Sequence, residues 1–342
     1  MTLRTSDFDY HLPPDLIAQH PLPERGTSRL LVVHRDTGRL DDRSFTDFPS
    51  LLAPGDLLVL NTTRVRHARL LGTRPSGAPA EVLLLHPAAD GTWIAMGKPG
   101  SALRPGKRIA LSPAVAIETV EVFEDGNRSV RFIGATADEA IQQFGRLPLP
   151  PYIDRDPDAD DELGYQTVYA ERESSVAAPT AGLHFTPDIL ARIEQRGVSI
   201  GRLELEVGPG TFKPVETEEI AQHPMHPERY NIPESLVTMV NQACQRGGRV
   251  WAVGTTVVRA LESAARNGVL RAGPGETTLM ITPGYQFQVV DRLLTNFHLP
   301  RSTLLMLVSA LAEPALVQAA YRHAVEQRYR FYSYGDAMVI TA

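Results

Sequence analysis

The chain has 342 residues, of which 43% are hydrophobic and 22% are charged, and its formal net charge is −6. This composition excludes a wholly disordered chain and supplies enough apolar side chains for two folded domains. The single cysteine, Cys244, excludes an internal disulfide framework and a cysteine-based zinc cluster, and the acidic balance does not favour a nucleic-acid binder unless basic residues cluster locally.

The first 60 residues predict a small α/β unit. Pro13-Pro14-Asp15 introduces a short helix, residues 30–33 form an apolar strand-like run, and Pro54-Gly55 turns the chain into a second run at 57–60. The N-terminus has no apolar core of signal-peptide length, and no run reaches the roughly 18 apolar residues of a membrane span. We therefore expect a cytoplasmic protein without a membrane partner.

Between residues 64 and 134 the pattern changes to short β-type runs separated by turn residues. Two hairpins are predicted, over 80–96 and 119–133, because each has an Asp-Gly pair between its runs. A further short strand is predicted at 108–111. Strands this short, without helices between them, predict a small barrel or sandwich.

The segment after this β-rich region is a connector. A helix is predicted at 137–144, and residues 147–152 form an extended proline-rich run. Residues 154–162 then hold six acidic side chains and one arginine, a pattern typical of a solvated surface loop.

From residue 186 onward, predicted helices alternate with predicted strands, which indicates an α/β sheet. The β-rich segment is therefore an insertion: residues 1–62 and 150–342 form a discontinuous α/β domain, and residues 63–149 form an inserted β-barrel domain. The helices are expected at 187–196, 233–246, 257–266, 302–313 and 315–327, and the strands at 203–207, 250–253, 279–281 and 337–340.

Residues 174–187 form a segment of small, uncharged residues in which His184 is the one ionisable side chain. The segment leads into a helix-start signal, with Thr186 placed to cap the helix and Pro187 at its first position. Such a segment lets a ligand approach the backbone closely.

Two glycine-containing loops are candidate ligand sites. The run through Gly254, Thr255 and Thr256 passes from a strand into a helix, whose N-terminus suits a carboxylate or phosphate; ordinary helix capping explains the threonines equally well. The loop with Gly210 and Thr211 is either a weak phosphate cradle or a plain turn, because it lacks the spacing of known phosphate loops.

The histidines do not predict a metal site. His223 and His226 have a ligand-like gap, but no cysteine, HExxH motif or further cluster supports zinc. His184 and His298 differ because each lies in a loop just before a predicted helix, where α/β folds collect ligand groups.

An aromatic run covers residues 329–336 and lies beside Arg328 and Arg330. Core packing and base stacking both explain it. Basic residues also gather in the predicted barrel, which could make the barrel an RNA-facing patch; they include Arg64, Arg66, Arg69, Arg74, Lys98, Arg104, Lys107 and Arg108.

Several longer motifs are spread over nearly the whole chain. They are Leu57-Leu58-Val59-Leu60-Asn61, Pro148-Leu149-Pro150-Pro151-Tyr152-Ile153, Tyr165-Gln166-Thr167-Val168-Tyr169-Ala170, Ala177-Ala178-Pro179-Thr180-Ala181-Gly182-Leu183-His184-Phe185, Val253-Gly254-Thr255-Thr256, Thr295-Asn296-Phe297-His298-Leu299-Pro300 and Tyr334-Gly335-Asp336-Ala337-Met338. By these motifs together, the chain resembles the S-adenosylmethionine:tRNA ribosyltransferase-isomerase family of queuosine biosynthesis.

The resemblance implies a discontinuous α/β domain with an inserted β-barrel, in agreement with the pattern. It also implies that the ribosyl group of S-adenosylmethionine moves to 7-aminomethyl-7-deazaguanine in a tRNA anticodon and is isomerised, giving epoxyqueuosine-tRNA, adenine and methionine. S-adenosylmethionine is then a consumed substrate, and no metal or other cofactor is expected. The partner is tRNA, and a monomer is favoured.

This chemistry needs a base beside the sulfonium, stabilisation of the departing adenine and a neutral amine nucleophile. As hypotheses, His184 or His298 does the acid–base work and Asp336 is the orienting carboxylate. Arg64, Arg66, Arg69 and Arg330 are the candidate RNA contacts. The candidate S-adenosylmethionine pocket comprises Thr180, Gly182, Gly210, Thr211, Thr255 and Thr256, with Arg259 for charge pairing.

Three positions depart from the usual family motifs: Thr62 and Glu206 stand where the family has Asp and His, and Gly164 stands where it has Arg. They leave two alternatives to the family reaction. One is a divergent paralogue that uses S-adenosylmethionine on a different acceptor, and the other is a non-catalytic RNA-binding protein with the same fold.

Overall fold

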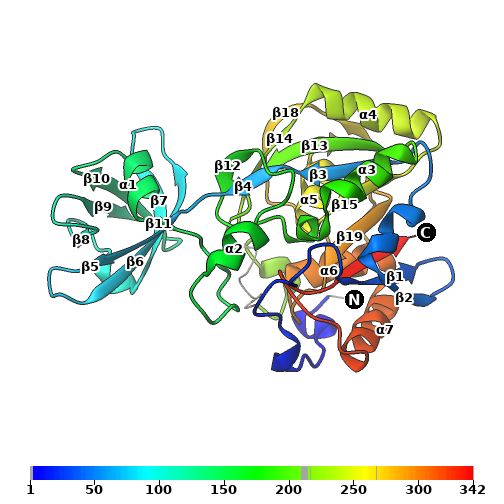
Figure 1. Cartoon of the computed structure of the whole chain (residues 1–342), viewed down its shortest axis with the longest axis horizontal. Helices are drawn as coiled ribbons and strands as arrows, with labels where there is room; N and C mark the ends of the chain where they lie inside the picture. The colour runs from blue at the N-terminus through cyan, green and yellow to red at the C-terminus, as the bar shows by residue number, and fades with distance from the viewer. Residues whose placement is uncertain (1–2, 209–214, 216, 267, 342) are drawn as a thin grey trace.

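The computed structural model describes residues 3–208, 215, 217–266 and 268–341. Within them the chain forms two bodies at opposite ends of the long axis, a large α/β body and a smaller barrel (Figure 1). The segments between the bodies are the paired short strands β4 (Thr63–Val65) and β12 (Arg172–Ser175) and the helix α2 (Ala159–Gly164). The sequence prediction of a discontinuous α/β domain with an inserted β-barrel is confirmed.

The large body is built on a nine-stranded mixed sheet. Its four central strands, β13, β3, β15 and β19, are parallel, and β20 returns antiparallel beside β19. In spatial order the strands are β18 (Gly273–Thr277), β14 (Glu228–Ile232), β13 (Ser199–Leu205), β3 (Leu57–Asn61), β15 (Val250–Val253), β19 (Arg292–Asn296), β20 (Ala337–Thr341), β1 (Arg29–His34) and β2 (Leu40–Ser44).

Both faces of this sheet are covered, which explains why its central strands read as continuous apolar runs. In β3, Leu57 and Val59 enter the core on one face, whereas Leu58 and Leu60 enter the core on the other. The first face packs against α4 (Glu234–Gln245), α5 (Thr255–Ala264), α6 (Thr303–Ala312) and α7 (Pro314–Glu326). The second packs against α3 (Pro187–Gln195) and a 3₁₀ segment, Phe45–Leu51.

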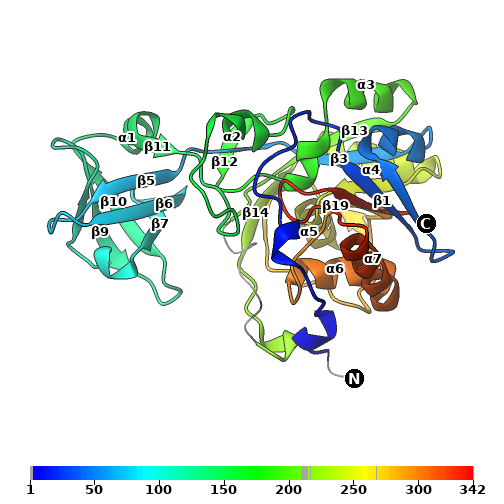
Figure 2. The ribbon, with the colours of Figure 1, turned by 60° about the horizontal axis from the view of Figure 1, so that its bottom comes forward.

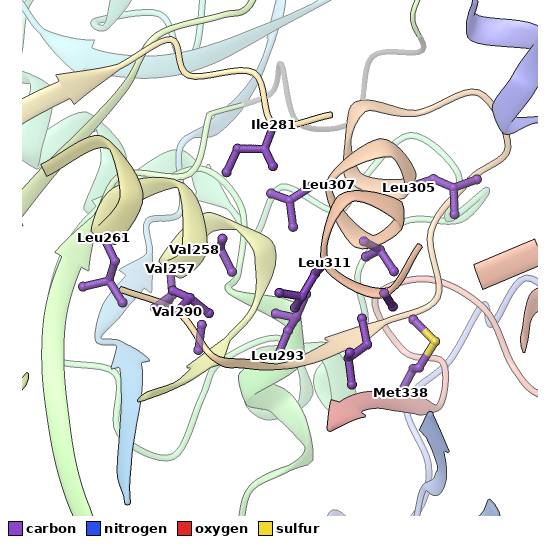
Figure 3. Packing of buried hydrophobic residues seen from close by; sticks show 14 of the residues in the cluster. Val257, Val258, Leu261, Ile281, Val290, Leu293, Leu305, Leu307, Leu311 and Met338 are labelled. Atoms are coloured by element: carbon purple, nitrogen blue, oxygen red, sulfur yellow. The ribbon is translucent and has the colours of Figure 1, made fainter. Parts of the chain in front are cut away.

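Helix α5 lies at the centre of the first core. Its Val257, Val258 and Leu261 belong to one apolar cluster with Leu307 and Leu311 of α6 and the strand residue Leu293 (Figure 3). Because α5 is surrounded in this way, even its polar residues are buried, including Thr255, Thr256, Arg259 and Glu262. This packing fixes the N-terminus of α5 at the carboxyl end of the central strand β15.

The smaller body is a six-stranded barrel that is closed by a pairing between Thr73 and Ala110. The barrel is filled by apolar side chains such as Leu70, Val82 and Val130. The strands are β5 (Arg69–Thr73), β6 (Pro79–Pro87), β7 (Trp93–Lys98), β10 (Arg128–Ile133), β9 (Ala116–Val122) and β8 (Arg108–Ala110), and α1 (Ala137–Phe144) with β11 (Gly145–Arg146) lies on the outside, β11 pairing with β5.

We propose the predicted boundaries, 62/63 and 149/150, for the two domains. The strand β3 of the large sheet ends at Asn61, and β11 on the barrel ends at Arg146. Both boundaries therefore fall in the segments that join the two bodies (Figure 2).

Some predicted elements are wrong. Residues 279–281 are not a strand; the strand in this region is β18, which pairs with β14. β19 follows the loop after it and was not predicted, and a small hairpin of β16 (Ala265–Arg266) and β17 (Val269–Leu270) replaces the expected end of the helix after residue 264.

The acidic stretch 154–162 is not simply a solvated loop, because it contains the first turn of α2. Asp161 is fully buried and receives two bonds from the Arg155 guanidinium, at 2.6 and 2.7 Å. The Tyr334 hydroxyl also donates to it, at 2.6 Å. One carboxylate of this stretch therefore ties the connector to the C-terminal segment.

The described part of the chain has no single helix that is both long enough and apolar enough to cross a membrane. Helices α6 and α7 meet this requirement only when they are counted together, and they are bent by 116° where they meet.

Candidate active site

The candidate site is a pocket at the carboxyl ends of the central strands, the edge where open α/β sheets bind ligands. It has about 750 Å³ of empty space, part of which is open to solvent. Segments distant in sequence meet here because Asn296, the last residue of β19, pairs with Ala337, the first residue of β20. The lining comprises residues 178–181, Val207, residues 254–256, residues 295–299, Tyr152, Ser302, Leu304, Tyr332 and Ser333.

The described lining holds no acidic or basic side chain other than a histidine, His298. Its polar groups are hydroxyls and one amide, and its apolar groups include the rings of Tyr152, Phe297 and Tyr332. A cation in such a pocket is poorly solvated by protein charges, so that loss of a proton from that cation is favoured.

The one built-in electrostatic feature of the pocket is the N-terminus of α5. Gly254 has a φ of 91°, a value that favours glycine, and this turn sends the chain from β15 directly into the helix at Thr255. The first N–H groups of a helix lack intrahelical partners and carry the positive end of the helix dipole. This helix has ten residues, and its first two, Thr255 and Thr256, line the pocket, so an anionic group can bind there.

His298 lies in the pocket wall. Its Nε2 is 2.8 Å from the Thr295 hydroxyl, and its backbone N–H donates to the Tyr321 hydroxyl at 3.0 Å. Burial lowers the pKa of His298 to about 3, so that the imidazole is neutral at neutral pH. With Nε2 engaged by Thr295, Nδ1 is the ring nitrogen left for a ligand.

His184 lies behind the pocket rather than in its described lining. Its Nδ1 is 2.8 Å from the Ser28 hydroxyl, and its Nε2 is 3.2 Å from the amide nitrogen of Asn296. Burial, helped by the positive charges of Arg25 and Arg330, lowers the pKa of His184 to about 3. Both nitrogens of this neutral ring therefore already have partners within the protein.

His184 also borders a second cavity, and Ser333 lines both this cavity and the pocket. Ser28, Gly164 and Tyr334 line this cavity together with the loop at residues 21–26. The hydrogen-bonded chain from Ser28 through His184 to Asn296 thus connects the second cavity to the pocket wall.

Asp336 accepts the backbone N–H groups of Arg29 and Arg330, each at 2.8 Å. Burial raises the pKa of this carboxyl above its usual value, although both backbone bonds and the two nearby arginines oppose the shift. Within the described residues its carboxylate bonds to neither candidate histidine. The carboxylate instead fixes the segment before β20 to the start of β1.

The residues predicted for the S-adenosylmethionine pocket are only partly brought together. Thr180, Thr255 and Thr256 line the pocket. Gly182 does not, because it packs against Tyr169, whose hydroxyl would lie 2.1 Å from an added Cβ. Gly210 and Thr211, also predicted for this pocket, lie outside the described residues.

Arg259 points away from the pocket, into the protein. It pairs with the buried carboxylate of Glu228, with 2.7 Å between Nη1 and Oε2, and donates to the Leu279 carbonyl at 3.1 Å. Its charge is therefore matched by a protein group rather than by a ligand in this conformation.

The predicted RNA contacts differ in how free they are. Arg64 and Arg66 each donate to a backbone carbonyl, those of Ala170 and Glu173, and neither has a carboxylate partner among the described residues. Arg69 instead bridges Glu81 and Asp156, at 3.0 Å from each. Arg330 is half-buried and donates to the His20 carbonyl.

The sequence did not indicate several polar residues of the pocket, among them Tyr152, Asn296, Ser302 and Tyr332. Tyr152 and Asn296 lie within the motifs that carry the family resemblance, which is the signal that could have found them. Most of the aromatic run is core, since Tyr329 and Phe331 are fully buried, but Tyr332 reaches the pocket.

The three positions that depart from the family motifs all lie outside the pocket lining. The hydroxyl of Thr62 is bound to the Leu203 carbonyl at 3.3 Å. Glu206 lines a separate cleft between the sheet and the barrel hairpin at residues 123–127, and Gly164 lines the cavity behind His184. Within the described ranges, no group of three or more His, Cys, Asp or Glu residues is arranged to hold a metal ion.

The fold and the pocket together define a class: an α/β protein with an inserted barrel and a small-molecule pocket at the ends of its parallel strands. The chain belongs to the queuosine biosynthesis family, whose model, described as "Queuosine biosynthesis protein", matches residues 5–340.

Two curated relatives are called S-adenosylmethionine:tRNA ribosyltransferase-isomerase. The protein from Cupriavidus pinatubonensis is 54% identical, with 99% of each chain covered, and that from an Azoarcus species is 49% identical, with 100% of this chain and 98% of the relative covered. A crystal structure of the S-adenosylmethionine tRNA ribosyltransferase from Thermotoga maritima is 37% identical and has a TM-score of 0.57, covering 98% of this chain and all of the other.

Proposed function

We propose that this chain is an S-adenosylmethionine:tRNA ribosyltransferase-isomerase. It transfers the ribosyl group of S-adenosylmethionine to 7-aminomethyl-7-deazaguanine in tRNA and isomerises it, giving epoxyqueuosine-tRNA, adenine and methionine. The observation that carries the proposal is full-length identity of about one half to relatives named for this activity. S-adenosylmethionine is a substrate that is consumed, and the reaction as written requires no further cofactor.

The pocket suits S-adenosylmethionine in two respects. The methionyl carboxylate of S-adenosylmethionine can bind the free N–H groups and the hydroxyls at the N-terminus of α5, where Thr255 and Thr256 lie. Its sulfonium lies among uncharged groups, so that removing a proton from the adjacent ribosyl carbon turns a poorly solvated cation into a neutral ylide. The uncharged lining therefore promotes the first step of the reaction.

We assign the base to His298 rather than to His184. His298 lines the pocket as a neutral imidazole; with its ring proton on Nε2, donated to the Thr295 hydroxyl, Nδ1 keeps the lone pair, whereas both nitrogens of His184 are already bonded. A base needs a free lone pair within reach of the proton that it takes. His184 then acts as a positioning residue through Asn296, and Asp336 positions the segment that carries Tyr332 and Ser333.

The family reaction is favoured over the two alternatives. A paralogue with another acceptor would require the departures at Thr62, Glu206 and Gly164 to alter the chemistry, and all three lie outside the pocket. A non-catalytic RNA-binding protein would not need an uncharged pocket with a neutral histidine. We further propose that the protein acts as a cytoplasmic monomer, with Arg64 and Arg66 among its contacts to tRNA.

The proposal is tested by incubating the protein with S-adenosylmethionine and measuring adenine and methionine, with and without tRNA that carries the deazaguanine precursor. We expect release only with that tRNA. The His298→Ala variant should lose activity by about 100-fold or more, because general-base catalysis contributes on this scale.

Two outcomes would contradict the proposal. Release that requires a different acceptor would favour the paralogue, and RNA binding without release under any acceptor would favour the non-catalytic protein. His20 is exposed and lines neither the pocket nor the cavity behind His184, so it serves as the control, and His20→Ala should turn over at the wild-type rate. Full turnover by His298→Ala would remove that residue from the chemistry.

A further inference from the structure

Two buried polar atoms of pocket-lining residues have no hydrogen-bond partner among the residues that the structure describes. They are Oδ1 of Asn296, a residue that is 3% exposed, and the hydroxyl of Tyr332, which is 8% exposed. Both residues line the pocket. Buried polar groups are almost always paired, so unpaired ones at a pocket indicate atoms that a ligand satisfies.

The orientation of the Asn296 amide is fixed by its neighbours. Its nitrogen lies 3.0 Å from the Tyr332 carbonyl, which can only accept a hydrogen bond, so this atom must be the NH₂ group and not the oxygen. The same NH₂ group donates to Nε2 of His184, which places the ring proton of that neutral histidine on Nδ1, facing Ser28. The unpaired atom of Asn296 is therefore a pure acceptor held in a single orientation.

Tyr332 is also held in a single position, and its backbone is strained there. Its φ is 71°, in the left-handed region that non-glycine residues rarely adopt. Its carbonyl receives bonds from Asn296 and from the Gly335 N–H, and its own N–H donates to the Phe297 carbonyl. The ring also packs on that of Tyr152, with 4.1 Å between centroids. The two unpaired atoms thus belong to residues that are joined by a hydrogen bond.

We propose that Asn296 Oδ1 and the Tyr332 hydroxyl together bind the two ribosyl hydroxyls of S-adenosylmethionine, which makes them specificity residues for the group that is transferred. The inference rests on the proposed function. A vicinal diol offers two donors close together; the amide oxygen accepts one, and the phenol can donate or accept at the other.

The neutrality and position of the pair favour the sugar over the other donors of this substrate. The methionyl ammonium is a cation, and cationic groups are usually met by carboxylates, whereas the described lining has none. Asn296 is two residues from His298, the group assigned to remove a proton from the sugar. Oδ1 of Asn296 should therefore face the ribosyl ring.

Tyr332→Phe separates a binding role from a structural one. Because the hydroxyl has no partner among the described residues, removing it should leave the melting temperature unchanged or raise it, while S-adenosylmethionine binding weakens by about 10-fold. The matched control is Tyr321→Phe, whose hydroxyl accepts the His298 N–H at 3.0 Å, so that this variant should melt at a lower temperature. Unchanged affinity in Tyr332→Phe would overturn its part in the proposal.

Substrate analogues then identify the group that is bound. By calorimetry without tRNA, the 2′,3′-dideoxy analogue of S-adenosylmethionine should bind wild type at least about 10-fold more weakly than S-adenosylmethionine. In Asn296→Ala and in Tyr332→Phe this difference should shrink several-fold, because the lost partners are the same. An N6-methyl analogue should be discriminated equally by wild type and both variants.

The assignment would be overturned if the affinity difference between S-adenosylmethionine and its dideoxy analogue were as large in the variants as in wild type. It would also be overturned if the variants instead changed the affinity difference for the N6-methyl analogue. Should Asn296→Ala fail to fold, Tyr332→Phe alone decides. The test also stands apart from the proposed function. If the dideoxy difference shrinks in the variants but adenine release does not depend on tRNA, the proposed tRNA acceptor is refuted and the assignment of Asn296 and Tyr332 stands. If the wild type binds no S-adenosylmethionine, both proposals are refuted.

Discussion

Both histidines of the site are buried as neutral rings, which makes the stability of the protein depend on pH. Burial lowers the pKa of His184 and His298 to about 3, whereas an unfolded histidine titrates near its ordinary pKa of about 6.5. Between these values the unfolded chain binds more protons than the folded one. Stability is therefore complete above pH 6.5 and falls as the pH is lowered toward 3.

We expect each histidine to cost roughly 2 kcal/mol of unfolding free energy when the pH falls from 7 to 5. Urea denaturation of wild type and His184→Gln at both pH values measures this directly. The variant should be less sensitive to acid than wild type, whatever its stability at pH 7. An equal loss in both proteins would show that His184 is not buried in its neutral form.

Residue types were predictable from the sequence, but their partners were not. The sequence indicated His184 and His298 equally, because each precedes a helix. The difference between them comes from Asn296, which is 112 residues away from His184 along the chain and occupies its Nε2. Long-range pairing of this kind leaves no local pattern, and the same reason explains why Arg259 was expected to face a ligand although Glu228 already pairs with it.

At the scale of elements, the 3₁₀ turn Thr180–His184 shows why a glycine is required where no ligand binds. A Cβ on Gly182 would lie 2.1 Å from the Tyr169 hydroxyl and 2.9 Å from Thr167 Cγ2, both distances too short for ordinary contact. The turn is thus pressed onto the connector segment that carries Tyr169. Its close packing holds Thr180 and Ala181 against the pocket.

Gly182→Ala should lower the unfolding free energy by about 1–3 kcal/mol, the usual cost of overpacking. Tyr169→Phe removes the nearest clashing atom, so the double variant should recover part of this loss. Gly208→Ala is the control, because an added Cβ there meets no atom of the described residues within 4 Å and should change stability by less than about 0.5 kcal/mol. Chemical denaturation of wild type, the two single variants, the double variant and the control gives the comparison, and strictly additive losses would refute the clash.

Elements with strong periodicity were predicted well, and those that depend on pairing were not. The strand at 250–253 and the helix at 137–144 match the structure residue for residue. β19 was missed because its Arg-Leu-Leu-Thr-Asn sequence gains strand character only between β15 and β20. Helix α5 starts two residues earlier than expected, because the turn at Gly254 leads straight into it.

At the scale of the whole molecule, we propose that two arginines on the connection between the bodies bind RNA phosphates. Arg64 and Arg66 lie in or next to β4 and lack carboxylate partners among the described residues, while Arg69 is held by two carboxylates. Charges already paired gain less from a phosphate. Only the first two should therefore contribute strongly to tRNA binding.

Joint replacement of Arg64 and Arg66 by Gln should reduce the slope of log K against log salt by about 1.4, if each neutralises one phosphate of a single-stranded anticodon loop. Arg69→Gln is the matched control and should change the slope little. Filter binding of tRNA over a range of salt concentrations measures both. A slope that stays the same after the joint replacement would exclude the connection as an RNA contact.

The chain enters the barrel at β5 and leaves it at β11, and these two strands are neighbours, since Arg69 and Leu70 pair with Arg146 and Gly145. Once the barrel has formed, the two ends of the insertion are fixed within a single hydrogen-bonded pair. The large sheet then has a short, fixed connection in place of a flexible loop of many tens of residues. The entropic cost of pairing β3 with β13 and β15 is therefore smaller. The inserted body thus shortens the effective chain of its host, so that a barrel which folds first would also speed the assembly of the sheet that carries the site.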